Sequence, residues 1–223
     1  MRKNQAGFTL VEIAIVLVII GLLLGGVLKG QELINSAKVK NFAQDFRTIP
    51  LFIYGYQDKF KALPGDDANV ATHVTGATKA TTGTQGNGVI EGNWDATDST
   101  VESVLFWQHV RLANLAAGST DFSDNAKAAA SVPTNADGGR IGVESVSSHF
   151  IQNNDGTWLG GTYLVCSGGI QGKFAKQLDT TTDDGKTDEG SMRVVATGHT
   201  RGNKALANAN VDDGTNYVVC LAF

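Results

Sequence analysis

The chain has 223 residues, of which 42% are hydrophobic and 18% are charged. This apolar fraction is ample for a core and excludes a wholly disordered chain, and a content of only 3 prolines beside 27 glycines excludes a collagen-like repeat. The formal net charge of -4, from 18 basic and 22 acidic residues, argues against a protein whose main task is to wrap nucleic acid. We therefore expect a folded protein with no specific nucleic-acid partner.

A long apolar segment follows a short basic leader that contains Arg2 and Lys3. Residues 8–28 carry one charge, Glu12, and as a helix they would extend about 31 Å, which matches the apolar core of a bilayer. The sequence that follows, 25–32, lacks the small-residue cleavage site of a secretory signal peptide. We therefore expect this segment to remain in the mature protein as its one membrane span.

The single charge inside this segment needs an explanation, because a carboxylate in hydrocarbon costs at least about 2.5–3.5 kcal/mol. If the chain were cut between Gly7 and Phe8, the new amino group would lie one helical turn from Glu12. That cation would then pair with the carboxylate, on the same chain or on a neighbour. The alternative is a tolerated charge that reaches the lipid headgroups, and the residues alone leave both interpretations open.

The segment Gly7-Phe8-Thr9-Leu10-Val11-Glu12, with the apolar run behind it, resembles the prepilin cleavage and methylation signal. Type IV pilins, minor pilins and type II secretion pseudopilins share this signal. The resemblance implies that a membrane-embedded prepilin peptidase cuts after Gly7 and N-methylates Phe8. It also implies that Glu12 guides each subunit into a filament by pairing with a neighbour's N-terminus.

Partners and location follow from the same resemblance. The partners would be other copies of the chain, the prepilin peptidase, and an inner-membrane assembly platform driven by an ATPase. Before assembly the chain would be a single-pass protein of the bacterial inner membrane with a periplasmic head. After assembly it would belong to an extracellular filament on the cell surface.

The expected domains are a leader (1–7), a membrane and filament-core helix (8–30), and a globular head that includes the amphipathic part of the first helix (31–223). The favoured function is a structural subunit, not an enzyme, of a type IV pilus or related filament. The alternatives are a type II secretion pseudopilin and a membrane-anchored periplasmic binding protein.

A helical period continues beyond the membrane segment to about Phe60 or Lys61, with apolar residues at steps of three and four. Pro50 lies inside this pattern and is expected to kink or locally break the helix. The apolar members of the stripe are Leu33, Ala37, Val39, Phe42, Phe46, Ile49, Ile53, Tyr56 and Phe60.

The head begins with a turn at 63–67, Leu-Pro-Gly-Asp-Asp, which should end the first helix. Residues 99–102, Ser-Thr-Val-Glu, fit a capping box with Ser99 as the N-cap. They predict a second helix to about Ala116, with Gly118 as its stop. The stretch between the turn and this helix, and the stretch after Gly118, are predicted as loops.

Four short β-rich runs bounded by glycine follow, at 140–146, 162–166, 191–196 and 216–223. They predict an antiparallel sheet packed on the first helix, which is an α+β fold of the pilin-like kind.

Two of the predicted strands contain the only cysteines, Cys166 and Cys220. A retained membrane segment favours a head outside the cytoplasm, where disulfides persist. We therefore favour a disulfide over two buried thiols. The resemblance agrees, since many pilins fasten a C-terminal region in this way.

Acidic residues crowd the segment 179–189, and carboxylates in such a glycine-containing loop can bind Ca²⁺. Some pseudopilins carry a calcium site in a late loop, but the spacing here does not match an EF-hand, and solvated turns are the favoured interpretation. No histidine has metal-binding spacing and no catalytic motif is present, so no cofactor is expected, with Ca²⁺ as the alternative. The acidic residues are Asp179, Asp183, Asp184, Asp188 and Glu189.

Overall fold

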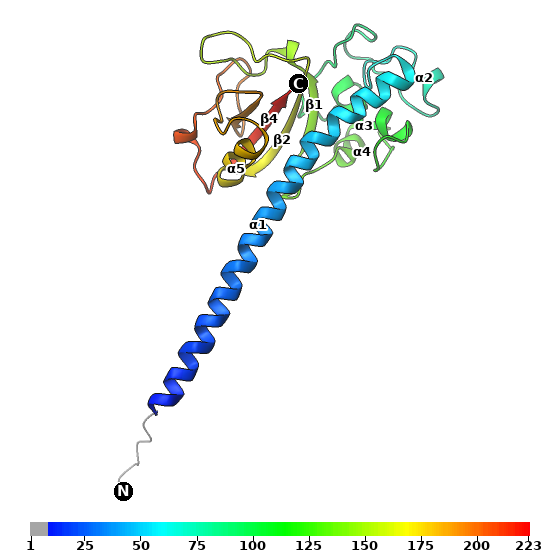
Figure 1. Cartoon of the computed structure of the whole chain (residues 1–223). Helices are drawn as coiled ribbons and strands as arrows, with labels where there is room; N and C mark the ends of the chain where they lie inside the picture. Colours follow the sequence, from blue (N-terminus) through cyan, green and yellow to red (C-terminus); the bar gives the residue numbers. More distant parts are fainter. Residues whose placement is uncertain (1–8) are drawn as a thin grey trace. The chain divides into compact units, whose positions relative to one another are not determined.

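The computed structural model describes residues 9–223, which divide into two compact units, one up to Lys38 and one from Val39 to Phe223. Helix α1 (Leu10–Phe60) begins in the first unit and ends in the second (Figure 1). The other helices are α2 (Val70–His73), α3 (Glu102–Leu112), α4 (Asn125–Ser131) and α5 (Gly172–Thr182). The strands are β1 (Ile141–Ser145), β2 (Tyr163–Gln171), β3 (Met192–Ala196) and β4 (Asn216–Ala222), and 3-10 turns lie at Val146–Ser148 and Asn208–Asn210.

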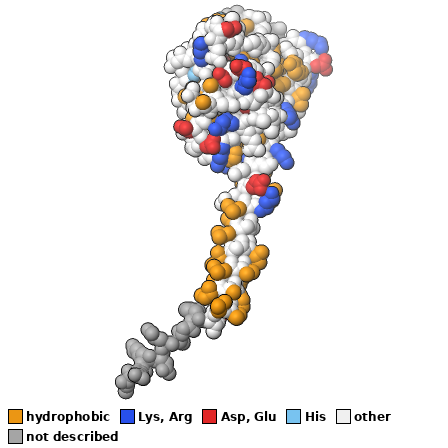
Figure 2. All heavy atoms as spheres, turned by 60° about the vertical axis from the view of Figure 1, so that its left-hand side comes forward, with side chains coloured by type: hydrophobic (Ala, Val, Ile, Leu, Met, Phe, Trp, Pro, Cys, Tyr) orange, Lys and Arg blue, Asp and Glu red, His pale blue; other side chains and the backbone are white. Residues whose placement is uncertain are grey.

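The first unit is a length of helix with no buried residue among those described. Figure 2 shows hydrophobic side chains along this part of α1. Leu33 and Ala37 belong to the apolar stripe that was predicted to pack on the head, but both are exposed. Burial along α1 begins at Val39. The predicted stripe is therefore correct only from Val39 onward.

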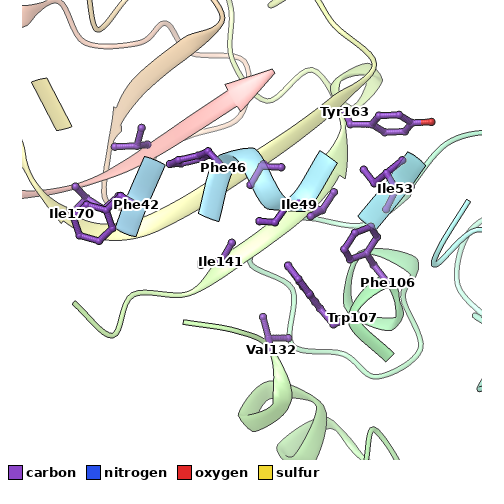
Figure 3. Close-up of a cluster of buried hydrophobic side chains, with 14 of the residues drawn as sticks. Phe42, Phe46, Ile49, Ile53, Phe106, Trp107, Val132, Ile141, Tyr163 and Ile170 are labelled. Atoms are coloured by element: carbon purple, nitrogen blue, oxygen red, sulfur yellow. The ribbon is translucent and has the colours of Figure 1, made fainter. Parts of the chain in front are cut away.

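The second part of α1 supplies the core of the second unit. Its buried side chains recur at steps of three and four because only one face of the helix contacts the sheet and α3. Figure 3 shows these residues against side chains from α3, β1 and β2. The labelled members of the cluster are Phe42, Phe46, Ile49, Ile53, Phe106, Trp107, Val132, Ile141, Tyr163 and Ile170.

Helix α1 continues through Pro50, where the sequence predicted a kink or a local break. A proline removes one backbone donor from a helix. Ile49 and Ile53, on either side of it, are buried to 3% and 0% exposure. Core packing of these flanking side chains therefore outweighs the lost hydrogen bond, and the helix is not interrupted.

The sheet confirms the α+β arrangement that the sequence predicted. Its four strands are antiparallel in the order β1-β2-β4-β3. All four predicted β-rich runs form strands, and β2 extends to Gln171, beyond the predicted end at 166. The register of β2 against β4 shifts between Ser167 and Ile170, where Gly169 has a φ of 72°.

Both outer edges of the sheet are covered by other parts of the chain. On β1, the Ile141 N–H donates to the Pro133 carbonyl at 2.9 Å, and the Ser145 N–H donates to the Ile90 carbonyl at 3.1 Å. On β3, Val194 bonds through its N–H to Thr187 and through its carbonyl to Leu206. Coverage of this kind leaves little of either edge available for pairing with a strand of another molecule.

The turn at 63–67 fastens the end of α1 to α3. The Gly65 N–H donates to Nδ1 of His109 at 2.9 Å, and Nε2 of His109 bonds to the Thr78 carbonyl at 2.8 Å. Gly65 has a φ of 92°, and a Cβ there would lie 2.4 Å from the Glu102 carbonyl oxygen, so glycine is required. His109 is thus a packed, fully buried side chain, and burial lowers its pKa.

The predicted capping box at the start of α3 does not form. The N-cap is Val101, and no side chain caps the helix there. Ser99 instead bonds to the Asn125 side chain, and the Glu102 carboxylate accepts the Glu91 N–H at 2.8 Å. Both side chains of the motif, Ser99 and Glu102, therefore form hydrogen bonds with other parts of the fold and not with the start of α3.

Helix α3 also ends earlier than predicted, at Leu112 rather than near Ala116. Asn114, with a φ of 61°, adopts the left-handed conformation that follows many helix ends, so the predicted stop at Gly118 is not used. Three short helices were not predicted at all. They are α2, α4, which is capped by Asp124, and α5, which packs on the sheet.

Candidate functional site

Glu12 lies in the first turn of α1 and closes a capping box with Thr9. The carboxylate accepts the Thr9 N–H and the Thr9 hydroxyl, each at 2.8 Å. In return, the Thr9 hydroxyl oxygen accepts the Glu12 N–H at 3.3 Å. This reciprocal pair satisfies backbone donors that the helix itself leaves unpaired.

The capping box gives Glu12 a partner in its own segment, whereas the sequence predicted only a new N-terminus as the partner. Thr9-Leu10-Val11-Glu12 has the spacing of a capping box, and this spacing is the signal that identifies Thr9. The hydrogen bonds reduce the cost of placing a carboxylate at the membrane boundary. Gly7 and Phe8, the predicted cleavage and methylation residues, lie outside the described residues.

The apolar surface of the first unit extends from Leu10 to Leu28 and surrounds Glu12. Among residues 9–223, α1 is the helix long and apolar enough to cross a membrane, and its apolar stretch is unburied. Burial of each large side chain is worth about 1.5–3 kcal/mol, so this surface requires a covering of lipid or protein. The exposed members are Leu10, Val11, Ile13, Ile15, Val16, Leu17, Val18, Ile19, Ile20, Leu22, Leu23, Leu24, Val27 and Leu28.

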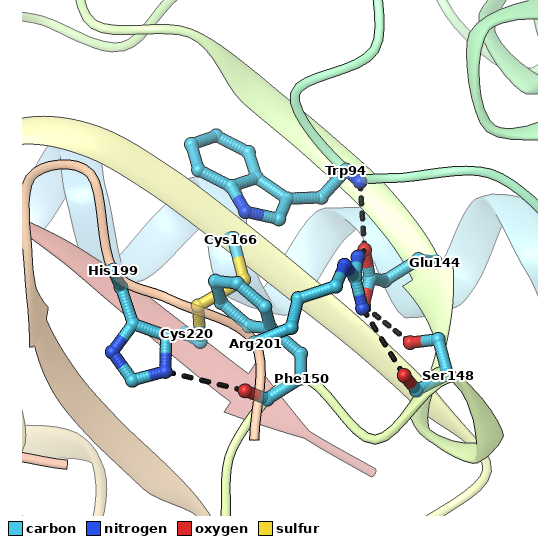
Figure 4. The surroundings of a disulfide bond; sticks show 8 residues. All are labelled: Trp94, Glu144, Ser148, Phe150, Cys166, His199, Arg201 and Cys220. Carbon is cyan, nitrogen blue, oxygen red and sulfur yellow. Dashed lines mark hydrogen bonds and ion pairs between the residues drawn. A yellow bond between two sulfur atoms is a disulfide. The ribbon is translucent and has the colours of Figure 1, made fainter. Parts of the chain in front are cut away.

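Cys166 on β2 and Cys220 on β4 are joined by a disulfide (Figure 4). The two residues lie directly opposite each other in the register of the two strands, and both are fully buried. The bond therefore crosses between the two central strands of the sheet. Trp94 and Phe150 belong to the same buried cluster and shield it from solvent.

A buried carboxylate beside this cluster holds three segments together. Glu144 on β1 is fully buried, and it accepts the Trp94 N–H at 2.8 Å and the Ser148 hydroxyl. Arg201 forms an ion pair with the same carboxylate and donates to the Ser148 carbonyl at 3.2 Å. Because the buried charge is both paired and hydrogen-bonded, it fixes the loop that carries Arg201 to the sheet.

The acidic residues of 179–189 do not converge on a common centre. Asp179 lies in α5 and not in a loop, and burial raises its pKa to about 6. Asp183 accepts the Ser191 and Met192 N–H groups at 2.6 and 2.7 Å. Glu189 pairs with Lys186 at 2.7 Å.

The two remaining carboxylates of this segment also have separate partners. Asp184 accepts the Lys186 N–H, and Asp188 accepts from the Asn154 side chain. Within residues 9–223, no group of three or more His, Cys, Asp or Glu side chains is placed to hold a metal ion. The calcium site in this segment therefore stays a prediction from the sequence.

Comparison with known families bears on the N-terminal segment. Residues 2–28 match the family model described as the prokaryotic N-terminal methylation motif. The chain carries the type IV pilin and prepilin signature. The motif supports a protein like a type IV pilin or pseudopilin, and with the apolar helix it is compatible with membrane anchoring before assembly. No curated protein and no solved structure gives a significant match to the chain.

The disulfide is expected to make a large contribution to the stability of the second unit. Replacing Cys166 and Cys220 together by Ala should lower the free energy of unfolding by about 4 kcal/mol, because the bond closes a loop with a sequence separation of 54 residues. Denaturant unfolding of the oxidised wild type, the reduced wild type and the variant would measure this. Recovery of both cysteines as alkylated free thiols, in peptide maps made without reductant, would contradict the assignment.

Proposed function

We propose that the chain is the structural subunit, a pilin, of a type IV pilus or related extracellular filament. A prepilin peptidase cleaves it after Gly7 and N-methylates Phe8, and the mature chain polymerises through α1. One combined observation carries the proposal: the methylation motif at 2–28 takes in the apolar stretch of α1, which no described residue of the chain buries. Lipid covers this surface while the subunit is stored, and neighbouring subunits cover it in the filament.

The division of the chain supports this scheme. The proposed parts are a leader (1–7), a membrane and filament-core helix (8–30) and a head (31–223), which is periplasmic before assembly. The compact second unit begins at Val39 and contains all of the strands. A disulfide in this unit fits a compartment outside the cytoplasm, because cytoplasmic thiols are kept reduced.

The sheet edges support assembly through α1 over assembly through strand exchange. Hydrogen bonds to Ile90 and Pro133 cover β1, and hydrogen bonds to Thr187 and Leu206 cover β3. A subunit that polymerised by strand addition would need a free edge. The exposed apolar surface of α1 is therefore a larger area for contact with other copies than the strand edges.

Glu12 has two successive partners in the proposed pathway. In the separate subunit its carboxylate is held by Thr9. In the filament the N-terminal amine of a neighbour supplies a full positive charge, which binds a carboxylate more strongly than neutral donors do in a low-dielectric setting. This exchange favours the docked subunit over one that remains in the membrane.

The first prediction concerns processing. Mass spectrometry of the chain from membranes or filaments should show a mature form that starts at N-methylated Phe8, because the motif places cleavage after Gly7. Gly7→Leu should leave the leader attached, because the larger side chain crowds the cleavage position. Gly7→Ala is the matched control with a small side chain, and it should retain less of the leader than Gly7→Leu. Assembled protein that retains Met1 would refute the proposal.

The second prediction separates the charge of Glu12 from its role as a cap. Glu12→Gln can still accept the Thr9 N–H and complete a capping box, but it has no charge, whereas Glu12→Ala loses both. If the charge guides docking, both variants should insert into the membrane and yield at least tenfold fewer sheared surface filaments, counted by electron microscopy. A normal filament yield from Glu12→Gln would show that the carboxylate serves only as a cap.

The same filament preparation distinguishes the alternative functions. A type II secretion pseudopilin would form short assemblies that stay within the envelope, and a membrane-anchored periplasmic binding protein would form no filament. Long filaments in the sheared fraction of the wild type support the pilus subunit.

A further inference from the structure

Within the second unit, a loop at residues 83–91 is held in place by three carboxylates. Two of them belong to the turn after α1 and to α3, and the third belongs to the loop itself. The first is Asp66, in the turn that follows α1, which is 2% exposed. It accepts the N–H groups of Gly86, of Asn87 at 3.2 Å and of Gly88 at 2.7 Å. One buried side chain therefore binds three successive amides of the loop.

Two further carboxylates complete the attachment. Glu91, at the end of the loop, accepts the Thr84 N–H at 2.5 Å and the Asn87 side chain at 3.2 Å. Glu102, in the first turn of α3, is fully buried and accepts the Glu91 N–H at 2.8 Å. The other carboxylate oxygen of Glu102 is buried and makes no hydrogen bond.

Within the part of the chain that the structure describes, the cluster has no ion-pair partner. None of the ion pairs among residues 9–223 includes Asp66, Glu91 or Glu102. Burial, together with the charges of Asp66 and Glu91, raises the pKa of Glu102 to about 7, although the hydrogen bond from the Glu91 N–H opposes this shift. Burial and the charge of Glu91 likewise raise the pKa of Asp66. Buried carboxyl groups that repel one another are stabilised when one of them holds a proton.

We propose that the loop 83–91 is a proton-dependent latch, which a proton on the cluster of Asp66, Glu91 and Glu102 keeps closed and which loosens when that proton is lost. Protonation of Glu102 removes the charge from a carboxylate that is fully buried and has one oxygen without a hydrogen bond, so the closed form no longer contains an uncompensated buried charge. Loss of the proton places three negative charges together in a partly buried site. The amides of the loop then exchange these carboxylates for water.

Titratable groups on the neighbouring elements do not replace this proton. Asp67, in the same turn as Asp66, is occupied by the Tyr56 hydroxyl and by His73, at 2.8 and 2.7 Å. On β1, Glu144 pairs with Arg201. Two other groups are Tyr163 on β2, whose own pKa is raised, and His109 on α3, whose two ring nitrogens are occupied by the Gly65 N–H and the Thr78 carbonyl. Lys61 lines the same cleft as Asp66, and its ammonium group pairs with the Asp58 carboxylate at 3.4 Å.

The latch forms one wall of a cleft of about 760 Å³. Gly86 and Gly88 line this cleft, together with Asp66, Phe60 and His73. A loosened loop therefore widens the cleft and exposes aromatic surface at the end of α1.

The direction of the pH dependence follows from the raised pKa values. A carboxyl group with a higher pKa in the closed form stabilises that form fully below its ordinary pKa of about 4.3, and the stabilisation is lost as the pH rises to about 7. Loss of one proton changes the closing equilibrium by at most about tenfold per pH unit. The latch is therefore tightest in mild acid and loosest above neutral pH.

Hydrogen exchange of the full chain in detergent micelles would test this, with rates corrected for the intrinsic effect of pH. Protection of the Gly86, Gly88 and Glu91 amides should fall by up to about tenfold per pH unit between pH 5 and 7, and then level off. Amides of β4 report on global unfolding, and their protection should not follow this curve. Glu102→Gln, which imitates the protonated form, should keep the loop protected at pH 7.5 as the wild type does at pH 5.

Glu189→Gln is the matched control, because Glu189 is exposed and pairs with Lys186 outside the cluster, and it should behave as the wild type. Loop protection in the wild type that does not change with pH would overturn the proposal. So would an undiminished pH response in Glu102→Gln. A loop that 1 mM CaCl₂ closes at pH 7.5 to the same extent as acid would also overturn it, since a cation would then be the missing partner.

Discussion

Fourteen large aliphatic side chains between Leu10 and Leu28, each 46–86% exposed, create the constraint on which the function of the chain depends. At about 1.5–3 kcal/mol for each side chain, leaving them in water would cost tens of kcal/mol. That cost exceeds the usual net stability of a whole domain, which is about 5–15 kcal/mol. The surface must consequently be covered at every stage, and lipid and other copies of the chain are the two coverings that the methylation motif suggests.

In the proposed pathway, the second unit meets the opposite requirement, because it must stay folded while the covering of the helix changes. Val39 to Tyr56 on α1 form part of its core, so the helix that carries the apolar surface is also the element on which the sheet packs. The disulfide between β2 and β4 and the Glu144–Arg201 pair fasten the sheet and a late loop. Covered strand edges limit association through the sheet, which supports the proposed assembly through α1.

Sequence patterns predicted the elements that depend on local periodicity. The first helix was predicted because its apolar residues recur at the spacing of one helix face, and the four strands were predicted as β-rich runs bounded by glycine. Helix α5 was missed, although Phe174, Ala175 and Leu178 have helical spacing, because no side chain caps its start and the acidic residues behind it were assigned to a loop. A helix is hard to recognise from local sequence signals when tertiary contacts, and not a capping side chain, stabilise its start.

The Ser/Thr-x-x-Glu motif shows most directly what the sequence could not decide. It occurs at 9–12 and at 99–102, and only the first copy forms a capping box. At the second copy, Glu102 is buried and binds the Glu91 N–H of a loop whose path depends on the whole fold. The site residues Gly7, Phe8 and Glu12 could be proposed from sequence because their signal is local. The cluster of Asp66, Glu91 and Glu102 could not be, because a turn, a loop and a helix bring it together.

The central claim is that copies of this chain cover one another's apolar helices, and photo-cross-linking in cells tests it most directly. A photoreactive residue would replace Val16, which is 50% exposed, and in a separate strain it would replace Lys204 on the exposed surface of the second unit. The account predicts a ladder of covalent multimers of the chain from position 16, and loss of this ladder when Glu12 is changed to Gln. Cross-links from position 16 to lipid or to unrelated proteins alone, in cells that display filaments made of this chain, would contradict it.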